Sequence, residues 1–356
     1  MGDTGVREIP LLRMASADSH QLVLRTWPAA RELMRTVLKT HPALPIAARL
    51  GDGLSRRWLT RRANPYLDEI RRTAEKLGAR GGYFFNVVYE WACSTSVAPD
   101  TGGAGARMIR VLDWELSGMG RHTVIAEQQT PAGGFYNITW PGYAGVVTGM
   151  APGRFAAAIN QGPRPIAFRS FWPNEIAARW RMLSCSEALP ATHLLRLAFE
   201  TAADFDSAVA LLMDPRRVVA TPAIFIVSGV HAGQGAIVEA TGAERRRHDI
   251  GNGALGVAND WLSRDLEGVP IAPAREWAGQ ITPEQDSAIR RAGACKLQNG
   301  PFAGASTIPP PVLNSRTVLV AAMNARSGGM SVEALDAPRP GTLPRVVARR
   351  TLPSSP

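Results

Sequence analysis

Cysteine is scarce in this chain of 356 residues, where only Cys93, Cys185 and Cys295 occur. Three cysteines do not make the disulfide framework that holds small secreted domains together. Cys185 and Cys295 have no partner at metal-ligand spacing, and we interpret both as ordinary buried thiols. We therefore expect neither a metal site nor a cofactor.

Long apolar runs are also missing. No stretch reaches the roughly 18 apolar residues of a membrane-spanning helix, and residues 1–8 lack the apolar core of a signal peptide. We therefore expect a cytoplasmic protein. With 45% hydrophobic and 20% charged residues, the chain can bury a large core in one large domain or two modest ones.

The positive charge is dispersed. The net charge is +10 and almost all basic residues are arginine, but they are scattered or occur in short groups such as Arg56-Arg57 and Arg71-Arg72. There is no zinc-finger spacing and no basic stripe interleaved with aromatic residues, so a nucleic-acid partner is not expected. Arginine also serves solvated faces and carboxylate pairing, which is the simpler interpretation.

Residues 1–92 have a helical pattern. Residues 21–40 place apolar side chains on one face with arginines between them, and Pro28 is expected to kink or divide this helix. A second helix is predicted over 66–77, ended by Gly78, and a third over 83–92, running into Cys93. The apolar face of 21–40 either packs into the core or contacts a membrane or a lipid substrate.

Beyond Cys93 the pattern favours strands, with helices over 193–213 and 285–294. Strands are predicted over 94–98, 107–114, 123–129, 145–148, 154–160, 223–230, 236–240, 317–325 and 330–334. The glycines of 231–235 lie between two strands, which indicates a hairpin turn and not a dinucleotide loop. The order of elements favours an α+β fold of antiparallel sheets covered by helices. Residues 337–356, rich in proline and arginine, are expected to be disordered.

Cys93 is the candidate nucleophile, and a thiol nucleophile needs a base. None of the six histidines stands in a context that singles it out, so a Cys/His pair stays open without specific support. Alternatively, a cut before Cys93 frees an α-amine with a pKa of about 7.7–8.0 that can take the thiol proton. Arg110 and Asp113 suit a cation and an acceptor beside it. Their spacing of three points them to opposite faces of a strand unless a bulge intervenes.

Here the chain resembles a known family. The run from Asn86 to Asp100, with Tyr89, Glu90 and Cys93 inside it, is similar to the N-terminal-cysteine amidases of the N-acylethanolamine acid amidase and acid ceramidase group, relatives of the choloylglycine hydrolases. Further similar motifs follow in the same order, at 109–114, 142–153, 158–161, 222–229, 233–238, 257–260 and 289–292. The resemblance covers about residues 83 to 335.

The resemblance implies a fold and a mechanism. The fold is the four-layer αββα N-terminal-nucleophile hydrolase sandwich of two antiparallel sheets, preceded by a helical segment. The precursor cleaves itself between Ala92 and Cys93, which leaves a retained small chain over 1–92 and a catalytic domain over 93–336. The implied site consists of Cys93 with its α-amine as base, Arg110 and Asp113 around that amine and the thiolate, Asn259 as oxyanion donor, and Arg290, or its neighbour Arg291, stabilising the site.

Three departures from the family pattern bear on function. Gln161 replaces a glutamate, Ile109 and Val111 replace the glycine and asparagine that flank the motif arginine, and Ser94-Thr95 stands for threonine and serine. The implied activity is hydrolysis of a linear, non-peptide N-acyl C–N bond through an acyl-thioester. Two alternatives stay open: an acyltransferase of the same fold, and a non-catalytic binding descendant, which the loss of charge at Gln161 motivates.

Overall fold

The computed structural model describes residues 5–39, 44–61, 63–78, 81–87, 91–116, 118–164, 188–251, 253–339 and 341–354. Cys185 and the motif residues Tyr89 and Glu90 lie outside the described residues. The helices are α1 (Ser19–Arg25), α2 (Trp27–Lys39), α3 (Leu44–Arg61), α4 (Leu67–Leu77), α6 (Ala191–Thr201), α7 (Phe205–Met213) and α8 (Pro283–Lys296). Short 3-10 turns are η1 (Phe84–Asn86), η2 (Gly120–His122), η3 (Arg275–Trp277) and η4 (Ala305–Thr307).

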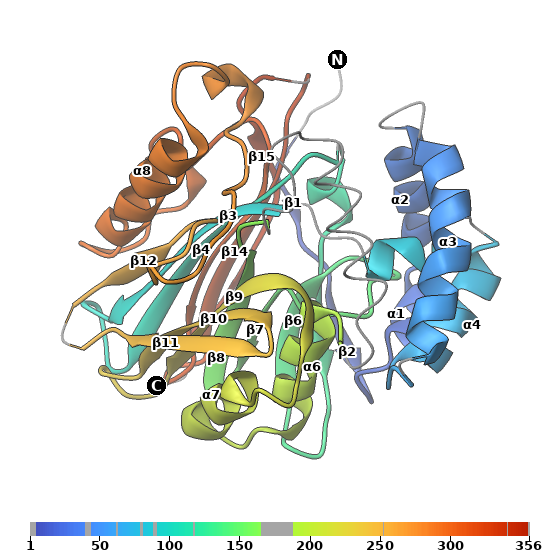
Figure 1. The fold of residues 1–356 in the computed structure, drawn as a ribbon, viewed down its shortest axis with the longest axis horizontal. Coiled ribbons are helices and arrows are strands. Elements are labelled where there is room, and N and C mark those ends of the chain that lie inside the picture. Colours follow the sequence, from blue (N-terminus) through green and yellow to red (C-terminus); the bar gives the residue numbers. More distant parts are fainter. Residues whose placement is uncertain are drawn as a thin grey trace.

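Two sheets form the body of the protein (Figure 1). The seven-stranded sheet has the order β1 (Arg7–Glu8), β15 (Arg345–Leu352), β14 (Gly329–Asp336), β13 (Thr317–Asn324), β4 (Ala106–Trp114), β3 (Trp91–Pro99) and β12 (Leu255–Val257). The eight-stranded sheet has the order β11 (Glu244–Asp249), β10 (Gly235–Gly242), β9 (Val219–Gly229), β8 (Phe155–Gln161), β7 (Thr148–Ala151), β6 (Phe135–Thr139), β5 (Val124–Gln128) and β2 (Leu11–Met14).

The sheets stack face to face between helices. Strands β3 and β4 of one sheet contact β8 and β9 of the other, α8 packs on β3 and β12, and α6 and α7 pack on β9. Alternate apolar side chains of both sheets fill the space between them. Most strand pairs are antiparallel, the exceptions being β1 with β15 and β2 with β5. The predicted α+β class and the αββα order of layers are confirmed.

The N-terminal segment confirms the expected division of its first helix and differs from the helical prediction in two other ways. Helices α1 and α2 meet at Thr26, with Pro28 at the second position of α2, where its fixed φ and missing N–H do no harm. Helix α3 has no counterpart among the predicted elements. The helix predicted over 83–92 is wrong, because η1 is a single turn and β3 begins at Trp91. Cys93 is therefore the third residue of a strand and does not stand at a helix end.

Both chain ends join the sheets. Strand β1 pairs with β15 and β2 pairs with β5, so residues 7–14 contribute an edge strand to each sheet. The prediction of disorder for 337–356 is wrong over Arg345–Leu352, since β15 pairs with β14 along its length. Arg345 and Arg349 are exposed, Ala348 is buried and Val346, Val347, Arg350 and Leu352 are half-buried, a strand pattern that the proline and arginine content obscured.

Other elements also depart from the predicted bounds. The helix predicted over 193–213 is divided into α6 and α7, because Asp204 caps α7 in a capping box with Ser207. The strand predicted over 145–148 is displaced to β7, and β6 was not predicted. Gly78 ends α4 with a positive φ of 54°, as expected for a helix-terminating glycine.

The apolar face of residues 21–40 packs into the protein. Leu22, Val23, Leu33, Met34 and Val37 are all buried. This burial supports the core-packing interpretation of the face, and contact of 21–40 with a membrane or a lipid substrate stays a prediction. Within the described ranges, no helix combines the length and the apolar character needed to cross a membrane.

Candidate active site

Strands β3 and β4 carry the first part of the site. They are antiparallel, with Cys93 opposite Leu112 and Ala92 opposite Asp113. Because side chains alternate along a strand, Cys93 projects into the space between the sheets, while Ser94 faces α8. No register shift interrupts this pair, so Arg110 lies on the inner face with Cys93 and Asp113 lies on the outer face. The opposite orientation expected from their spacing is confirmed.

Arg110 lies directly against the thiol. Its Nη2 is 3.1 Å from Cys93 Sγ and 2.7 Å from the Ile159 carbonyl oxygen. Its Nη1 donates to Thr95 Oγ1 at 2.8 Å and to Asn160 Oδ1. In the part of the chain that the structure describes, these hydrogen-bond partners include no carboxylate, although Arg110 is completely buried. A guanidinium placed in this way is suited to a negative charge that forms on the sulfur.

Burial and charge oppose each other at this pair. Burial raises the pKa of the Cys93 thiol, while Arg110, Arg290 and a backbone hydrogen bond from Asp113 work in the other direction. Burial likewise lowers the pKa of Arg110. In the uncut chain Cys93 has no exposed surface. Burial therefore favours the neutral thiol, while Arg110 already lies where it can stabilise the thiolate.

Asn259 brackets the bond before Cys93. Its Oδ1 accepts from the Cys93 backbone N–H at 2.6 Å, and its Nδ2 donates to the Trp91 carbonyl at 3.2 Å. Strand β12 explains this position, because Val257 pairs with Thr95 and Asn259 follows two residues later. Its side chain continues the ladder on both sides of Ala92. The Asn259 side-chain amide therefore holds the backbone on both sides of the candidate cleavage bond.

Gln161 holds the same segment from β8. Its Oε1 accepts from the Trp91 N–H at 3.0 Å, and its carbonyl accepts from Asn259 Nδ2 at 2.8 Å. An uncharged acceptor suffices for a backbone N–H. The missing negative charge at this position therefore does not impair this contact, and it gives no support to the binding-protein alternative.

The outer face carries a separate set of contacts. Asp113 Oδ2 accepts from Arg290 Nη2 at 2.5 Å and from Asn314 Nδ2 at 2.7 Å, and its Oδ1 accepts from Thr317 Oγ1 at 2.7 Å. Arg290 Nε also donates to Ser94 Oγ at 3.0 Å. Arg291 is exposed, so Arg290 is the arginine of this pair that reaches the site. Asp113 stands opposite Ala92, and its carboxylate does not touch the thiol.

Sequence reasoning did not identify four residues of the site as such. Asn160 and Thr95 lie inside matched motifs, and the unusual buried polar residues on alternating strand positions could have marked them. Asn314 and Thr317 come from a loop and the start of β13, 201 and 204 residues beyond Asp113. No local pattern signals such distant partners.

Histidine makes no hydrogen bond to Cys93 among the described residues. His193 Nδ1 is 3.0 Å from Asn64 Nδ2, and His248 Nε2 is 3.0 Å from Glu239 Oε2. The Cys/His alternative therefore finds no geometric support in the described part of the chain.

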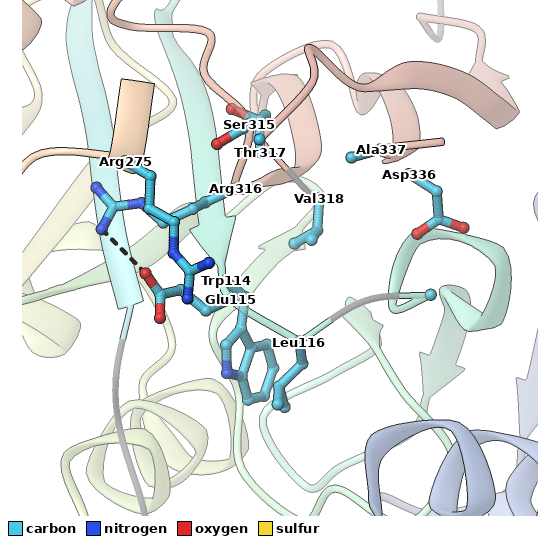
Figure 2. Close-up of a pocket in the computed structure, with 12 residues that line it drawn as sticks. Trp114, Glu115, Leu116, Arg275, Ser315, Arg316, Thr317, Val318, Asp336 and Ala337 are labelled. Carbon is cyan, nitrogen blue, oxygen red and sulfur yellow. Dashed lines mark ion pairs between the residues drawn. The ribbon is translucent and has the colours of Figure 1, made fainter. Parts of the chain in front are cut away.

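Two cavities lie near the site and share Trp114 and Leu116 in their linings. An apolar one of about 40 Å³ lies among α2, α4 and residues 140–143. A larger one of about 180 Å³ has charged residues in its wall (Figure 2). The Trp91 ring packs edge-on against Trp114 at 5.5 Å and Tyr143 at 6.4 Å, both of which line the apolar cavity.

Comparisons with known proteins give distant likenesses. No protein-family model and no curated protein matches the chain. A Caenorhabditis elegans N-acylethanolamine-hydrolyzing acid amidase ortholog is 18% identical, covering 66% of this chain and 93% of its own, with a TM-score of 0.49. A Clostridium perfringens conjugated bile acid hydrolase mutant is 10% identical, covering 73% of this chain and 92% of its own, with a TM-score of 0.42. An Agrobacterium tumefaciens penicillin V acylase is 15% identical, covering 68% of this chain and 83% of its own, with a TM-score of 0.35.

Proposed function

We propose that this protein is an amidase that cleaves its own chain before Cys93 and then hydrolyses a linear, non-peptide N-acyl C–N bond. One observation carries the proposal. A single buried site holds the Cys93 thiol against the Arg110 guanidinium and holds the Cys93 backbone N–H against Asn259. The nucleophile, the cation for its charge and the bond to be cut are thus assembled together.

Self-cleavage begins with attack of Cys93 Sγ on the Ala92 carbonyl carbon. The C–N bond breaks, a thioester forms between Ala92 and the sulfur, and the thiol proton passes to the freed α-amine. Water then hydrolyses the thioester and returns the thiol. Arg110 stabilises the negative charge on sulfur, and Asn259 keeps the scissile amide fixed, so that little reorganisation is needed.

Substrate turnover repeats this chemistry with an external amide. The α-amine of Cys93, with an ordinary pKa of about 7.7–8.0, takes the thiol proton and later gives it to the leaving amine. When Trp91 withdraws, Asn259 Nδ2 loses the Trp91 carbonyl and becomes a donor for the substrate oxyanion. The α-amine then activates the water that hydrolyses the acyl-thioester.

The small chain has contacts that keep it in place after the cut. It contributes β1 and β2 to the two sheets, and the buried Glu69 of α4 pairs with Arg196 of α6. These contacts do not involve the Ala92–Cys93 bond. We expect residues 1–92 to remain bound as part of the active enzyme.

The uncut chain also suggests where the acyl half of a substrate lies. In self-cleavage, residues 91–92 are the acyl half, and the Trp91 ring rests against Trp114 and Tyr143 of the apolar cavity. Withdrawal of this ring would join that cavity to the thiol. An apolar acyl chain is the group that such a space favours.

The test is the intact mass of the purified protein beside Cys93→Ala, with Cys295→Ala as a matched thiol control from α8. We expect wild type and the Cys295 variant to give two fragments that break between Ala92 and Cys93. Only the Cys93 variant should remain whole. An uncut wild-type chain that also resists thiol-directed acylation would sink the proposal.

An acyltransferase would share every step up to the thioester. Addition of a primary amine to a turnover assay separates the two activities. We expect water to compete successfully, so that free acid stays the main product. A main product in which the added amine carries the acyl group would reassign the enzyme to acyl transfer.

A further inference from the structure

The larger cavity, of about 180 Å³ and here called the charged cavity, lies on the acyl side of the candidate cleavage bond (Figure 2). In self-cleavage Ala92 supplies the acyl carbonyl, and Trp91 continues the chain from it. Trp91 pairs with Trp114 of β4, and on the other side of β4 the Trp114 backbone N–H donates to the Arg316 carbonyl at 2.7 Å. Trp91, Trp114 and Arg316 thus form one row across the sheet, and the last two line the charged cavity.

The Arg316 guanidinium has buried donors that lack an acceptor. Its side chain is only 11% exposed, Nη1 donates to the Ala272 carbonyl at 3.1 Å, and Nη1 lies 3.7 Å from Glu115 Oε1. Its Nε and Nη2 are buried and have no hydrogen-bond partner among the described residues. Buried donors of this kind are costly unless an acceptor satisfies them. Arg275 of η3 brings a second, exposed guanidinium to the same wall.

The carboxylates in and beside the wall are engaged or face solvent. The Asp336 carboxylate accepts from two backbone N–H groups of η2. The Glu276 carboxylate accepts from both the backbone N–H and the hydroxyl of Ser315, each at 2.6 Å. The Glu115 side chain is 61% exposed, and its contact with Arg316 is long. The cavity can therefore offer cationic donors to a ligand, and these match an acid group.

The row of residues also indicates how long a connecting acyl chain must be. Neighbouring strands lie about 4.8 Å apart, so the row from Trp91 across Trp114 to Arg316 spans roughly 10 Å. An extended chain advances about 3.3–3.6 Å for every three of its bonds, so roughly nine bonds cover this distance. Such a chain passes Trp114, which packs against the Trp91 ring and lines the apolar cavity as well as the charged one. An apolar chain that ends in an acid group therefore fits this path.

We propose that the charged cavity binds a carboxylate at the far end of the acyl chain, so that the preferred substrates are half-amides of long dicarboxylic acids. The inference rests on the proposed amidase function and adds an acid group to the apolar acyl chain. Hydrolysis of the C–N bond then releases the free diacid and the amine. Arg275 and Arg316 are substrate-binding residues in this assignment, since they donate to the carboxylate and take no part in bond breaking. Donors of this kind change kcat/KM by roughly 10–100-fold.

The experiment compares two amides of the same amine on the self-cleaved protein, the half-amide of nonanedioic acid and the amide of nonanoic acid. We expect kcat/KM to favour the half-amide by at least about tenfold. Arg275→Met and Arg316→Met should each lower this ratio by about tenfold. Glu115→Gln removes the carboxylate nearest to Arg316 Nη1 and should raise it. Arg264→Met removes an exposed arginine outside the cavity lining and should keep the wild-type ratio, which controls for general attraction by the net charge of +10.

Chain length supplies a second control that needs no variant. The half-amide of butanedioic acid is too short to reach from the thiol to Arg316, so we expect wild type to show no preference for it over the amide of butanoic acid. An equal preference for the short and the long half-amide would mean that the acid group acts close to the thiol, and it would overturn the assignment to the charged cavity.

The remaining outcomes separate this inference from the function on which it rests. Equal kcat/KM for both nine-carbon amides in a self-cleaved wild type, or a ratio that Arg275→Met does not change, overturns the carboxylate site and leaves the amidase intact. Preference for a further amide, which carries its acid on the leaving amine, overturns the assignment to the acyl chain. Absence of self-cleavage contradicts the amidase proposal itself. Arg275 is exposed, so its variant remains informative even if Arg316→Met fails to fold.

Discussion

Two buried arginines in this protein have opposite surroundings. Arg196 of α6 is paired with Glu69 and Glu200 and lies over the Tyr66 ring at 3.9 Å. Arg110 of β4 is equally buried, but its partners are a thiol, a hydroxyl, an amide and a carbonyl, and its Nε has no partner among the described residues.

The pKa values follow this difference. Burial alone lowers the pKa of Arg196, but Glu69 and Glu200 raise it above its usual value. At Arg110 burial prevails and the pKa falls, because neither Cys93 nor Asp113 compensates for it. Arg196 already has two carboxyl partners, Glu69 and Glu200, in the resting protein. Arg110 is a cation still lacking its anion, and the Cys93 thiolate would supply that anion. The buried Arg110 guanidinium thus indicates function because no carboxylate among the described residues bonds to it.

Substitution of the paired arginine should give the largest effect on stability. In the single-chain Cys93→Ala background, Arg196→Met leaves Glu69 and Glu200 without their cation. We expect the free energy of unfolding to fall by about 3–5 kcal/mol, measured by urea titration. Arg110→Met in the same background leaves no carboxylate behind and should cost far less. Equal losses for the two variants would remove the distinction between them.

The rate of self-cleavage should fall more in Arg110→Met than in Arg196→Met, which is the opposite order to the stability effects. Arg110→Met in the otherwise wild-type chain removes the cation at the sulfur, and we expect self-cleavage to slow by about 10²–10³-fold. The measurement is the fraction of cut chain against time, by intact mass. Arg196→Met, where it folds, should cleave at close to the wild-type rate. Rapid cleavage in Arg110→Met would show that this guanidinium does not serve the thiolate.

The sequence could predict one of these clusters and not the other. Cys93, Arg110, Asn259 and Arg290 lie in motifs whose order and spacing are visible along the chain. The structure brings Arg110 and Asn259 to Cys93 and places Arg290 on the outer face, against Ser94 and Asp113. Glu69 and Arg196 are 127 residues apart, on helices whose patterns show only which face is apolar. The strands at both chain ends were missed for a related reason, because their order depends on distant pairing partners.

The paired cluster should also carry a pH dependence. Burial raises the pKa of Glu69 from 4.5 to about 7, against the opposing effect of Arg196. A carboxyl whose pKa is raised on folding favours the native state while protonated, so its contribution is present below about pH 4.5 and is lost as pH rises through 7. We expect the stability of Cys93→Ala relative to Cys93→Ala/Glu69→Gln to fall by about 3 kcal/mol over that window.

The comparison of Cys93→Ala with Cys93→Ala/Glu69→Gln is necessary because His193 changes stability with pH in the opposite direction to Glu69. Burial lowers its pKa from 6.5 to about 3, so its contribution to stability is gained as pH rises through this range. Both variants keep His193, and its effect cancels in the difference. A difference that stays constant between pH 4.5 and 7 would contradict the assignment of the raised pKa to Glu69.

The smallest effect is expected at Gln161, whose contact with the Trp91 N–H is a neutral hydrogen bond. Gln161→Glu keeps an acceptor there, so self-cleavage should change by less than about tenfold. Gln161→Met has a similar volume but no such acceptor, and it leaves a buried N–H unsatisfied at a cost of about 1–3 kcal/mol. The two variants differ in whether position 161 accepts a hydrogen bond at all. If the glutamate variant cleaves as slowly as the methionine variant, charge matters at this position after all, and the site tolerates fewer changes around Arg110 than its uncharged contacts suggest.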